Sequence, residues 1–102
     1  MRIISQHGNV DLPYEQIIVC HAMENVTALH NEKEYILGKY SSQEKAYKAM
    51  KMLKEHYGLL SFMKLIAGTT KYESFIRRFA EDDFIKATAE YFQFPQDDEI
   101  EV

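Results

Sequence analysis

The single cysteine and two of the histidines come nearest to a chemical site by residue type. Cys20 and His21 are adjacent, and His30 follows nine residues later. A two-residue turn at Glu24-Asn25 would pair His21 with Ala28 and set the two histidines diagonally on one face, about 7–8 Å apart at Cα. Cys20 would then point to the opposite face, and neither Cys-x-x-Cys nor His-x-x-x-His occurs. The pattern therefore predicts an ordinary half-buried histidine pair and no metal site.

Nucleophilic and acid–base chemistry have equally little support. Cys20 lies in an apolar segment that disfavours the thiolate, so we expect it to pack in the core. Asp82-Asp83 and Asp97-Asp98 are adjacent pairs whose side chains diverge, which fits a helix boundary and a solvated tail. The four scattered glycines form neither G-x-G-x-x-G nor a P-loop. We expect no catalytic residue and no cofactor.

The first forty residues read as short strands that would position any such site. Candidate strands cover residues 2–6, 10–14, 17–23, 26–30 and 35–40, with turn residues between them. Pro13 has no backbone N–H, so its strand should lie at a sheet edge. The continuous apolar run at 17–20 predicts a strand covered on both faces. Together these segments predict an antiparallel β-meander of four to five short strands.

At Ser41 the apolar period changes from 2 to 3.6. Ser41 and Glu44 match a capping box, and Gly58 matches the left-handed residue that ends many helices, which predicts a helix over about 42–57. Its reverse side carries Lys48 and Lys51 interleaved with Glu44 and Glu55, typical of a solvated face rather than a phosphate site. The predicted fold class is α+β.

The second half continues with helical patterns. The apolar run 59–67 fits either a helix or a strand, and its Leu, Met, Lys and Ala content favours a helix. Residues 70–80 show another capping box and an amphipathic stripe, which raises the expected number of C-terminal helices to two or three. Tyr91–Phe94 alternates weakly before Pro95 and predicts a late edge strand. Beyond Gln96 we expect a frayed tail.

Length and charge indicate one domain over 1–96 with an acidic tail over 97–102. The chain has 102 residues and a net charge of −4, and four of its acids lie in the tail, which leaves a nearly neutral body. Because Lys and Arg contacts to phosphate dominate nucleic-acid affinity, a nucleic-acid partner is not expected. The single cysteine, the absence of a long apolar run and the lack of a secretory signal at residues 1–7 predict a cytoplasmic protein without a membrane span.

Three segments together resemble a family of small uncharacterised proteins of Gram-positive bacteria and their phages and mobile elements. They are Met1–Gln6 with Gly8 and Asp11–Glu15, Leu37–Ala46, and Tyr91–Pro95. The likeness covers the N-terminal half and about the last dozen residues. The family has no assigned activity, so the resemblance implies a phage-related setting and carries over no site residue.

These observations favour a non-enzymatic protein that binds an unknown protein partner. Part of the dense apolar run Leu59–Ile66 is a candidate homodimer face. An acidic DNA mimic that inhibits a host nucleic-acid enzyme is the alternative, and it rests on the tail charge alone. A third hypothesis, an enzyme using His21, His30 or Asp82, has no supporting constellation.

Overall fold

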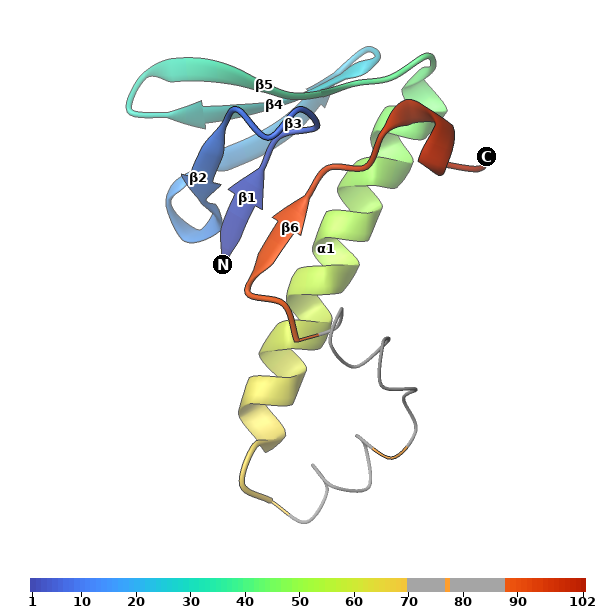
Figure 1. Ribbon diagram of the computed structural model, residues 1–102. Coiled ribbons are helices and arrows are strands. Elements are labelled where there is room, and N and C mark those ends of the chain that lie inside the picture. Colours follow the sequence, from blue (N-terminus) through green and yellow to red (C-terminus); the bar gives the residue numbers. More distant parts are fainter. Residues whose placement is uncertain (70–76, 78–87) are drawn as a thin grey trace.

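The structure is a computed structural model that describes residues 1–69, 77 and 88–102 of the chain. In the described residues, six β-strands form two three-stranded sheets beside one long α-helix (Figure 1). The elements, in chain order, are β1 (Arg2–Ile4), β2 (Asp11–Pro13), η1 (Tyr14–Gln16), β3 (Ile18–Ala22), β4 (Asn25–His30), β5 (Lys33–Lys39), α1 (Gln43–Ile66), β6 (Tyr91–Gln93) and η2 (Asp97–Glu99).

The first sheet, sheet A, joins the two ends of the chain in the order β2-β1-β6. β2 runs antiparallel to β1, whereas β6 runs parallel to it, with Ile3 opposite Phe92. Pro13 ends an outer strand, and β6 is the other outer strand, so both predicted edge strands are confirmed. Proline is tolerated there because an outer strand leaves one row of its N–H groups without ladder partners.

The second sheet, sheet B, is an antiparallel meander in the order β3-β4-β5. The predicted meander is confirmed over these three strands, whereas β1 and β2 belong to the other sheet. The β3–β4 turn is Met23-Glu24, one residue earlier than predicted, and Met23 has a φ of 56°. The β4–β5 turn is Asn31-Glu32, where both residues have positive φ, as two-residue hairpin turns of this hand require.

Helix α1 begins after Ser42, whose hydroxyl oxygen accepts the backbone N–H of Lys45 at 3.2 Å. The prediction that Ser41 caps the helix is therefore wrong: the capping residue is Ser42, one position later. The helix also does not end at Gly58 but continues to Ile66, so the two helices expected over 42–67 are one. The further helix expected over 70–80 lies outside the described residues. Among the described residues, no helix has both the length and the apolarity needed to cross a membrane.

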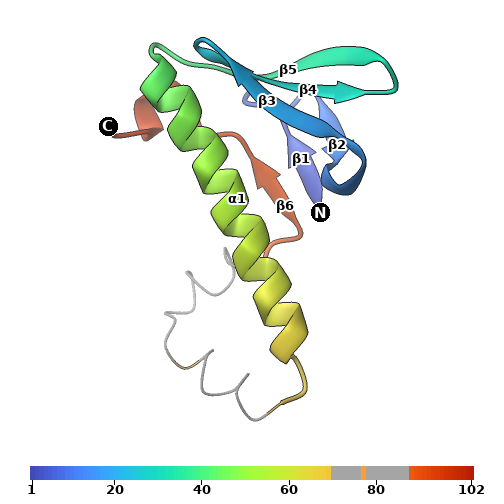
Figure 2. The ribbon, with the colours of Figure 1, turned by 180° about the vertical axis from the view of Figure 1, so that it is seen from behind.

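The core lies where sheet B, sheet A and the first half of α1 meet. Its largest fully buried side chains are Phe94, Ile3, Leu37, Leu53 and Val26. Both ribbon views place β6 between β1 and α1 (Figures 1 and 2).

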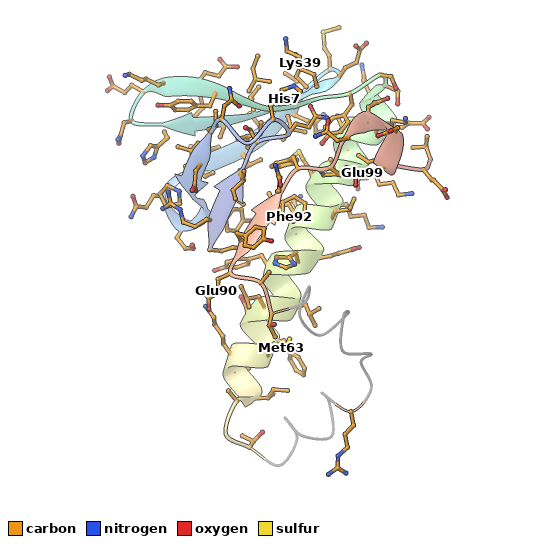
Figure 3. All side chains as sticks on the ribbon, viewed as in Figure 1. His7, Lys39, Met63, Glu90, Phe92 and Glu99 are labelled. Carbon is orange, nitrogen blue, oxygen red and sulfur yellow. The ribbon has the colours of Figure 1, made fainter. Side chains whose placement is uncertain are left out.

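The contact of β6 with the helix runs through Phe92, which lies between strand and helix (Figure 3). The Phe92 ring lies 5.9 Å from the His56 ring and 5.2 Å from the Phe94 ring. On the same side of α1, the Nε2 atom of His56 lies 2.9 Å from the carbonyl oxygen of Ala89. These contacts hold the returning chain against the helix.

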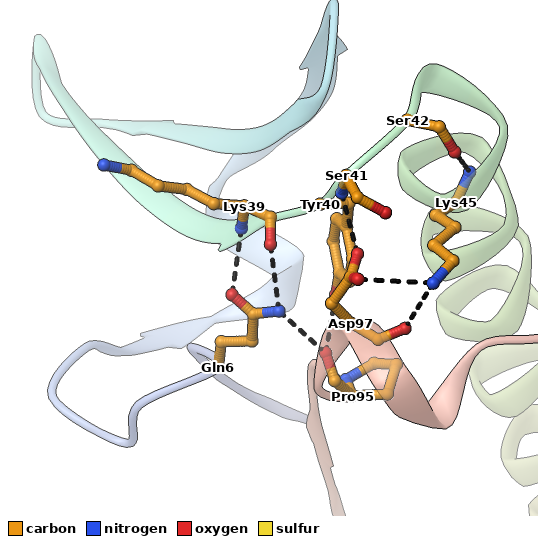
Figure 4. A network of polar contacts seen from close by, with 8 residues as sticks. All are labelled: Gln6, Lys39, Tyr40, Ser41, Ser42, Lys45, Pro95 and Asp97. Atoms are coloured by element: carbon orange, nitrogen blue, oxygen red, sulfur yellow. Dashed lines mark hydrogen bonds and ion pairs between the residues drawn. The ribbon is translucent and has the colours of Figure 1, made fainter.

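A polar network centred on Gln6 joins the two sheets to the C-terminal segment (Figure 4). The Gln6 amide oxygen accepts the Lys39 N–H at 2.9 Å, and its NH₂ group donates to the carbonyl oxygens of Lys39 and Pro95 at 3.2 and 3.1 Å. The Tyr40 hydroxyl also donates to Pro95, at 2.9 Å. The network therefore connects the segment after β1, the end of β5 and the segment after β6.

Candidate functional site

The outward face of sheet B is unusually apolar for an exposed surface. Residues opposite one another in antiparallel strands share a face, and the register gives the rows Ile18–Leu29–Glu34, Cys20–Thr27–Ile36 and Ala22–Asn25–Lys39. Ile18, Leu29 and Ile36 expose 64, 41 and 47% of their surface. We call these three rows the outer face. A solvated antiparallel sheet normally places polar side chains at such positions.

The exposed apolar side chains of the outer face lie in its first two rows, and its two charged residues lie at opposite ends of β5. Glu34 lies in the first row and Lys39 in the last, and Cys20 and Thr27 lie between them. The Cys20 Sγ atom is 3.4 Å from the Thr27 Oγ1 atom, and the same hydroxyl lies 3.4 Å from the Cys20 carbonyl oxygen, to which it donates. Apolar side chains bordered by polar and charged ones are the usual make-up of a protein–protein interface.

Cys20 is exposed on this face and does not pack in the core, so that prediction is wrong. The expectation that its strand is covered on both faces is also wrong, because β3 is an outer strand whose residues are mostly exposed. The physical reason is the position of the strand: β3 lies at the edge of sheet B, so its apolar side chains form part of the surface and are not covered on both faces.

The structure does not bring His21 and His30 together. His21 lies opposite Val26 and not Ala28, because the turn comes one residue earlier than predicted and shifts the pairing by two residues. The His21 ring contacts the Tyr47 ring edge-on at 6.2 Å. His30 lies at the other end of β4, where its Nδ1 atom is 3.4 Å from the Gln16 carbonyl oxygen. In the described ranges, no three metal-ligating side chains gather.

A small pocket lies between β3 and α1. Its volume is about 180 Å³, and it is lined by His21, Tyr47, Met50, Lys51 and Lys54. The imidazole and the two ammonium groups could attract an anion. The pocket is open, and its lysines are exposed at the surface, so they hold no fixed geometry for one ligand.

The chain end lies beside the same side of α1. A second pocket, of about 280 Å³, adds Glu44, Lys48 and Val102 to Tyr47 and Lys51. The Lys48 ammonium group donates to the carbonyl oxygen of Glu101. The lysine side of the helix is thus partly occupied by the tail of the chain itself.

The acidic tail is packed on the body and is not frayed, which corrects the prediction. Ile100 is only 4% exposed and belongs to the core. One Asp97 carboxylate oxygen accepts the Ser41 N–H at 2.7 Å, and the other pairs with the Lys45 ammonium group at 3.2 Å. The Ser41 N–H, followed by Lys45, lowers the pKa of the Asp97 carboxyl group. Asp97 is therefore a structural residue, whereas Asp98 is exposed.

The run Leu59–Ile66 is divided between two environments. Leu60, Met63 and Ile66 are buried, whereas Leu65 exposes 80% of its surface. Asp82, Asp83 and the rest of 78–87 lie outside the described residues, as do residues 70–76.

Sequence reasoning missed the outer face because its residues come from three strands. Only the register brings Ile18, Leu29 and Ile36 together, and the turn that sets the register was misplaced. The available signal was Leu29, an apolar residue at a position that alternates with the core residues Val26 and Ala28. Comparison with known proteins adds no relative: no family model matches the chain, and no curated protein or solved structure is similar to it.

Proposed function

We propose that this chain is a small non-enzymatic protein that binds another protein through the outer face of sheet B. The observation that carries the proposal is the exposure of Ile18, Leu29 and Ile36 on one continuous sheet surface. Burying apolar surface releases about 25 cal/mol per Å², so a partner that covers these side chains gains a driving force without any charged contact.

The partner chemistry follows from the composition of the face. Its centre has no charge, whereas Glu34 and Lys39 lie at opposite ends. A matching surface is apolar in the middle and carries a cation near Glu34 and an anion near Lys39, which would fix its orientation.

The non-enzymatic part of the proposal is supported by the other contacts of the residues that might react. The His21 ring packs against Tyr47, and the Nδ1 atom of His30 lies near a backbone carbonyl oxygen. The setting proposed for the protein, an accessory role in a phage or mobile element of Gram-positive bacteria, rests on the sequence resemblance.

The alternative function, acidic DNA mimicry, has less support. A mimic needs acids spread over a folded surface, but Asp97 pairs with Lys45 and Glu99 accepts the Gln96 N–H at 2.8 Å. The remaining tail acids, Asp98 and Glu101, are exposed. If mimicry is the function, the double variant D98N/E101Q should lose inhibition of a nucleic-acid enzyme without losing stability.

The experiment for protein binding is affinity capture from a Gram-positive host lysate with matched variants. Leu29→Lys and Ile36→Lys each replace an exposed apolar side chain of the outer face by a charge, and Leu65→Lys places the same charge on an exposed apolar residue of α1. We expect a protein that the wild type and L65K retain and that L29K and I36K bind more than tenfold more weakly, a loss of about 1.4 kcal/mol. Equal capture by all four proteins would contradict the proposal.

A further inference from the structure

Strand β3 has an open edge. It is the first strand in the order β3-β4-β5, so one side pairs with β4 and the other does not. In the part of the chain that the structure describes, residues 18–22 make no backbone hydrogen bond other than those to β4. Every second N–H and C=O group of β3 therefore points away from the sheet, ready to pair with another strand. In Figure 2, β3 is the strand of sheet B nearest the viewer.

The two outer strands of sheet B differ in how they are protected. β5 carries Lys33, Glu34 and Lys39, and its pairing with β4 has a register shift that skips Leu37. The carbonyl oxygen of Leu37 accepts the Gln6 N–H at 2.8 Å, so this edge is also partly covered. Charges, bulges and covering segments are the usual means by which proteins prevent edge pairing. β3, with the sequence Ile-Val-Cys-His-Ala, has none of the charges or bulges.

We propose that a second copy of this chain pairs with β3 in antiparallel orientation about a two-fold axis at Cys20. This inference rests on the proposed function, because the second copy would be one of the proteins that bind to sheet B. Antiparallel pairing of Ile18–Ala22 with itself places Ile18 opposite the second copy's Ala22, and Cys20 opposite its own counterpart. A two-fold interface is self-complementary by construction.

Charge selects the second copy as the occupant. The five residues of β3 include no Asp, Glu, Lys or Arg, so self-pairing brings no like charges together, whereas pairing through β5 would also align its Lys and Glu side chains. The two sheets would join into one of six strands, a common size, and both outer faces would lie on the same side. The dimer would thereby double the apolar surface offered to a partner.

The predicted dimer is weak. Two five-residue strands and their flanking side chains give an interface at the small end of the range, below roughly 1,200 Å², as in transient complexes. We expect dissociation in the micromolar to millimolar range, and light scattering or sedimentation of the full chain over that range measures it.

Three variants test the position of the axis. Cys20→Lys sets two ammonium groups opposite each other and should make the protein monomeric, whereas Cys20→Ser should leave the dimer unchanged. In the wild type, a short bis-maleimide should link the two Cys20 thiols, because directly opposite Cβ atoms lie about 4.5–5.5 Å apart. Circular dichroism of C20K checks folding, since Cys20 is exposed and the charge need not enter the core.

A charge pair tests the register. I18K/A22K places like charges opposite each other at both ends of the paired strands and should be monomeric. I18K/A22E places opposite charges there and should dimerise at least tenfold more tightly than I18K/A22K. Residues 18 and 22 of one copy are too far apart along the strand to pair with each other.

A monomer at every concentration, or a dimer that C20K leaves intact, would overturn this inference. The proposed function fails separately. If the wild type captures a protein that I36K loses, but sediments as a monomer at every concentration, protein binding stands and the dimer does not. A wild-type dimer that C20K breaks, with no I36K-sensitive captured protein, gives the reverse result.

Discussion

The side-chain amide of Gln6 pairs with the backbone of Lys39 as a neighbouring strand would. Its oxygen accepts the Lys39 N–H and its NH₂ group donates to the Lys39 carbonyl oxygen, at 2.9 and 3.2 Å. The same NH₂ group reaches the carbonyl oxygen of Pro95, and the backbone N–H of Gln6 donates to Leu37. One buried residue thus holds the end of β1, the end of β5 and the segment after β6 in place, and so supports the sheet that carries the outer face.

Replacing this amide should be costly. Gln6→Ala leaves the N–H and C=O groups of Lys39 without their side-chain partner and removes one of the two donors to the Pro95 carbonyl oxygen, and we expect a loss of about 2–4 kcal/mol in the free energy of unfolding. Urea denaturation followed by circular dichroism measures it. Gln16→Ala, at an exposed glutamine, is the control and should change stability by less than about 0.5 kcal/mol. Equal effects of the two variants would refute the role given to Gln6.

Two glycines should respond to alanine in opposite directions. A Cβ atom at Gly38 would lie 2.8 Å from Cε2 and 2.9 Å from the hydroxyl oxygen of Tyr40, so Gly38→Ala must displace a buried ring and should cost about 1–3 kcal/mol. Gly58 is exposed within α1, and a Cβ there meets nothing within 4 Å. Gly58→Ala should therefore raise stability by about 0.5–1 kcal/mol. Thermal unfolding distinguishes the two, and destabilisation by G58A would contradict the continuous helix.

The packed tail gives a third prediction. Ile100 is buried in the core, whereas Val102 is largely exposed. Ile100→Ala should lower the free energy of unfolding by about 2–4 kcal/mol, because it removes buried methyl groups and leaves a cavity. Val102→Ala should be nearly neutral. Chemical denaturation of both variants tests this, and a neutral I100A would restore the frayed tail that the sequence suggested.

The ion pair of Asp97 should make stability depend on pH. Its folded-state pKa is lowered by the Ser41 N–H and by Lys45, so the charged carboxylate favours the folded state. This contribution is fully present above the unfolded pKa, near 3.9, and is lost as the pH falls through the lower folded value. Asp97→Asn should therefore be less stable than the wild type at pH 7, and the difference should shrink as the acid range is entered.

Urea midpoints at several pH values measure this difference. Asp98→Asn is the control, because Asp98 is exposed and forms no ion pair with the described residues. A difference between D97N and the wild type that stays constant from pH 7 into the acid range would rule out the assigned ion pair.

Local patterns predicted much of the fold. The change of period after residue 41 indicated the start of α1, Pro13 indicated an outer strand, and the alternation at 91–94 indicated β6. In each case the signal is a property of neighbouring residues, such as a missing N–H or a repeat spacing, so no distant contact was needed to read it.

The errors arose where tertiary structure overrides local preference. Gly58 costs the helix about 1 kcal/mol, yet the buried stripe of Leu53, Leu60 and Met63 continues across it. Met23 takes a positive φ, for which its side chain gives no signal. The outer face depended on that turn, since a register shift changes which residues are neighbours across the strands.

The most direct test of the central claim uses the single thiol of the chain. A photo-reactive cross-linker attached to Cys20 lies in the outer face, and the same reagent on C20S/L65C lies on the exposed side of α1. After irradiation in host lysate, we predict that mass spectrometry finds a protein joined to Cys20 and absent from the control, and that Ile36→Lys abolishes this product. Identical products from both positions, or none from Cys20, would contradict the claim that the outer face of sheet B binds proteins.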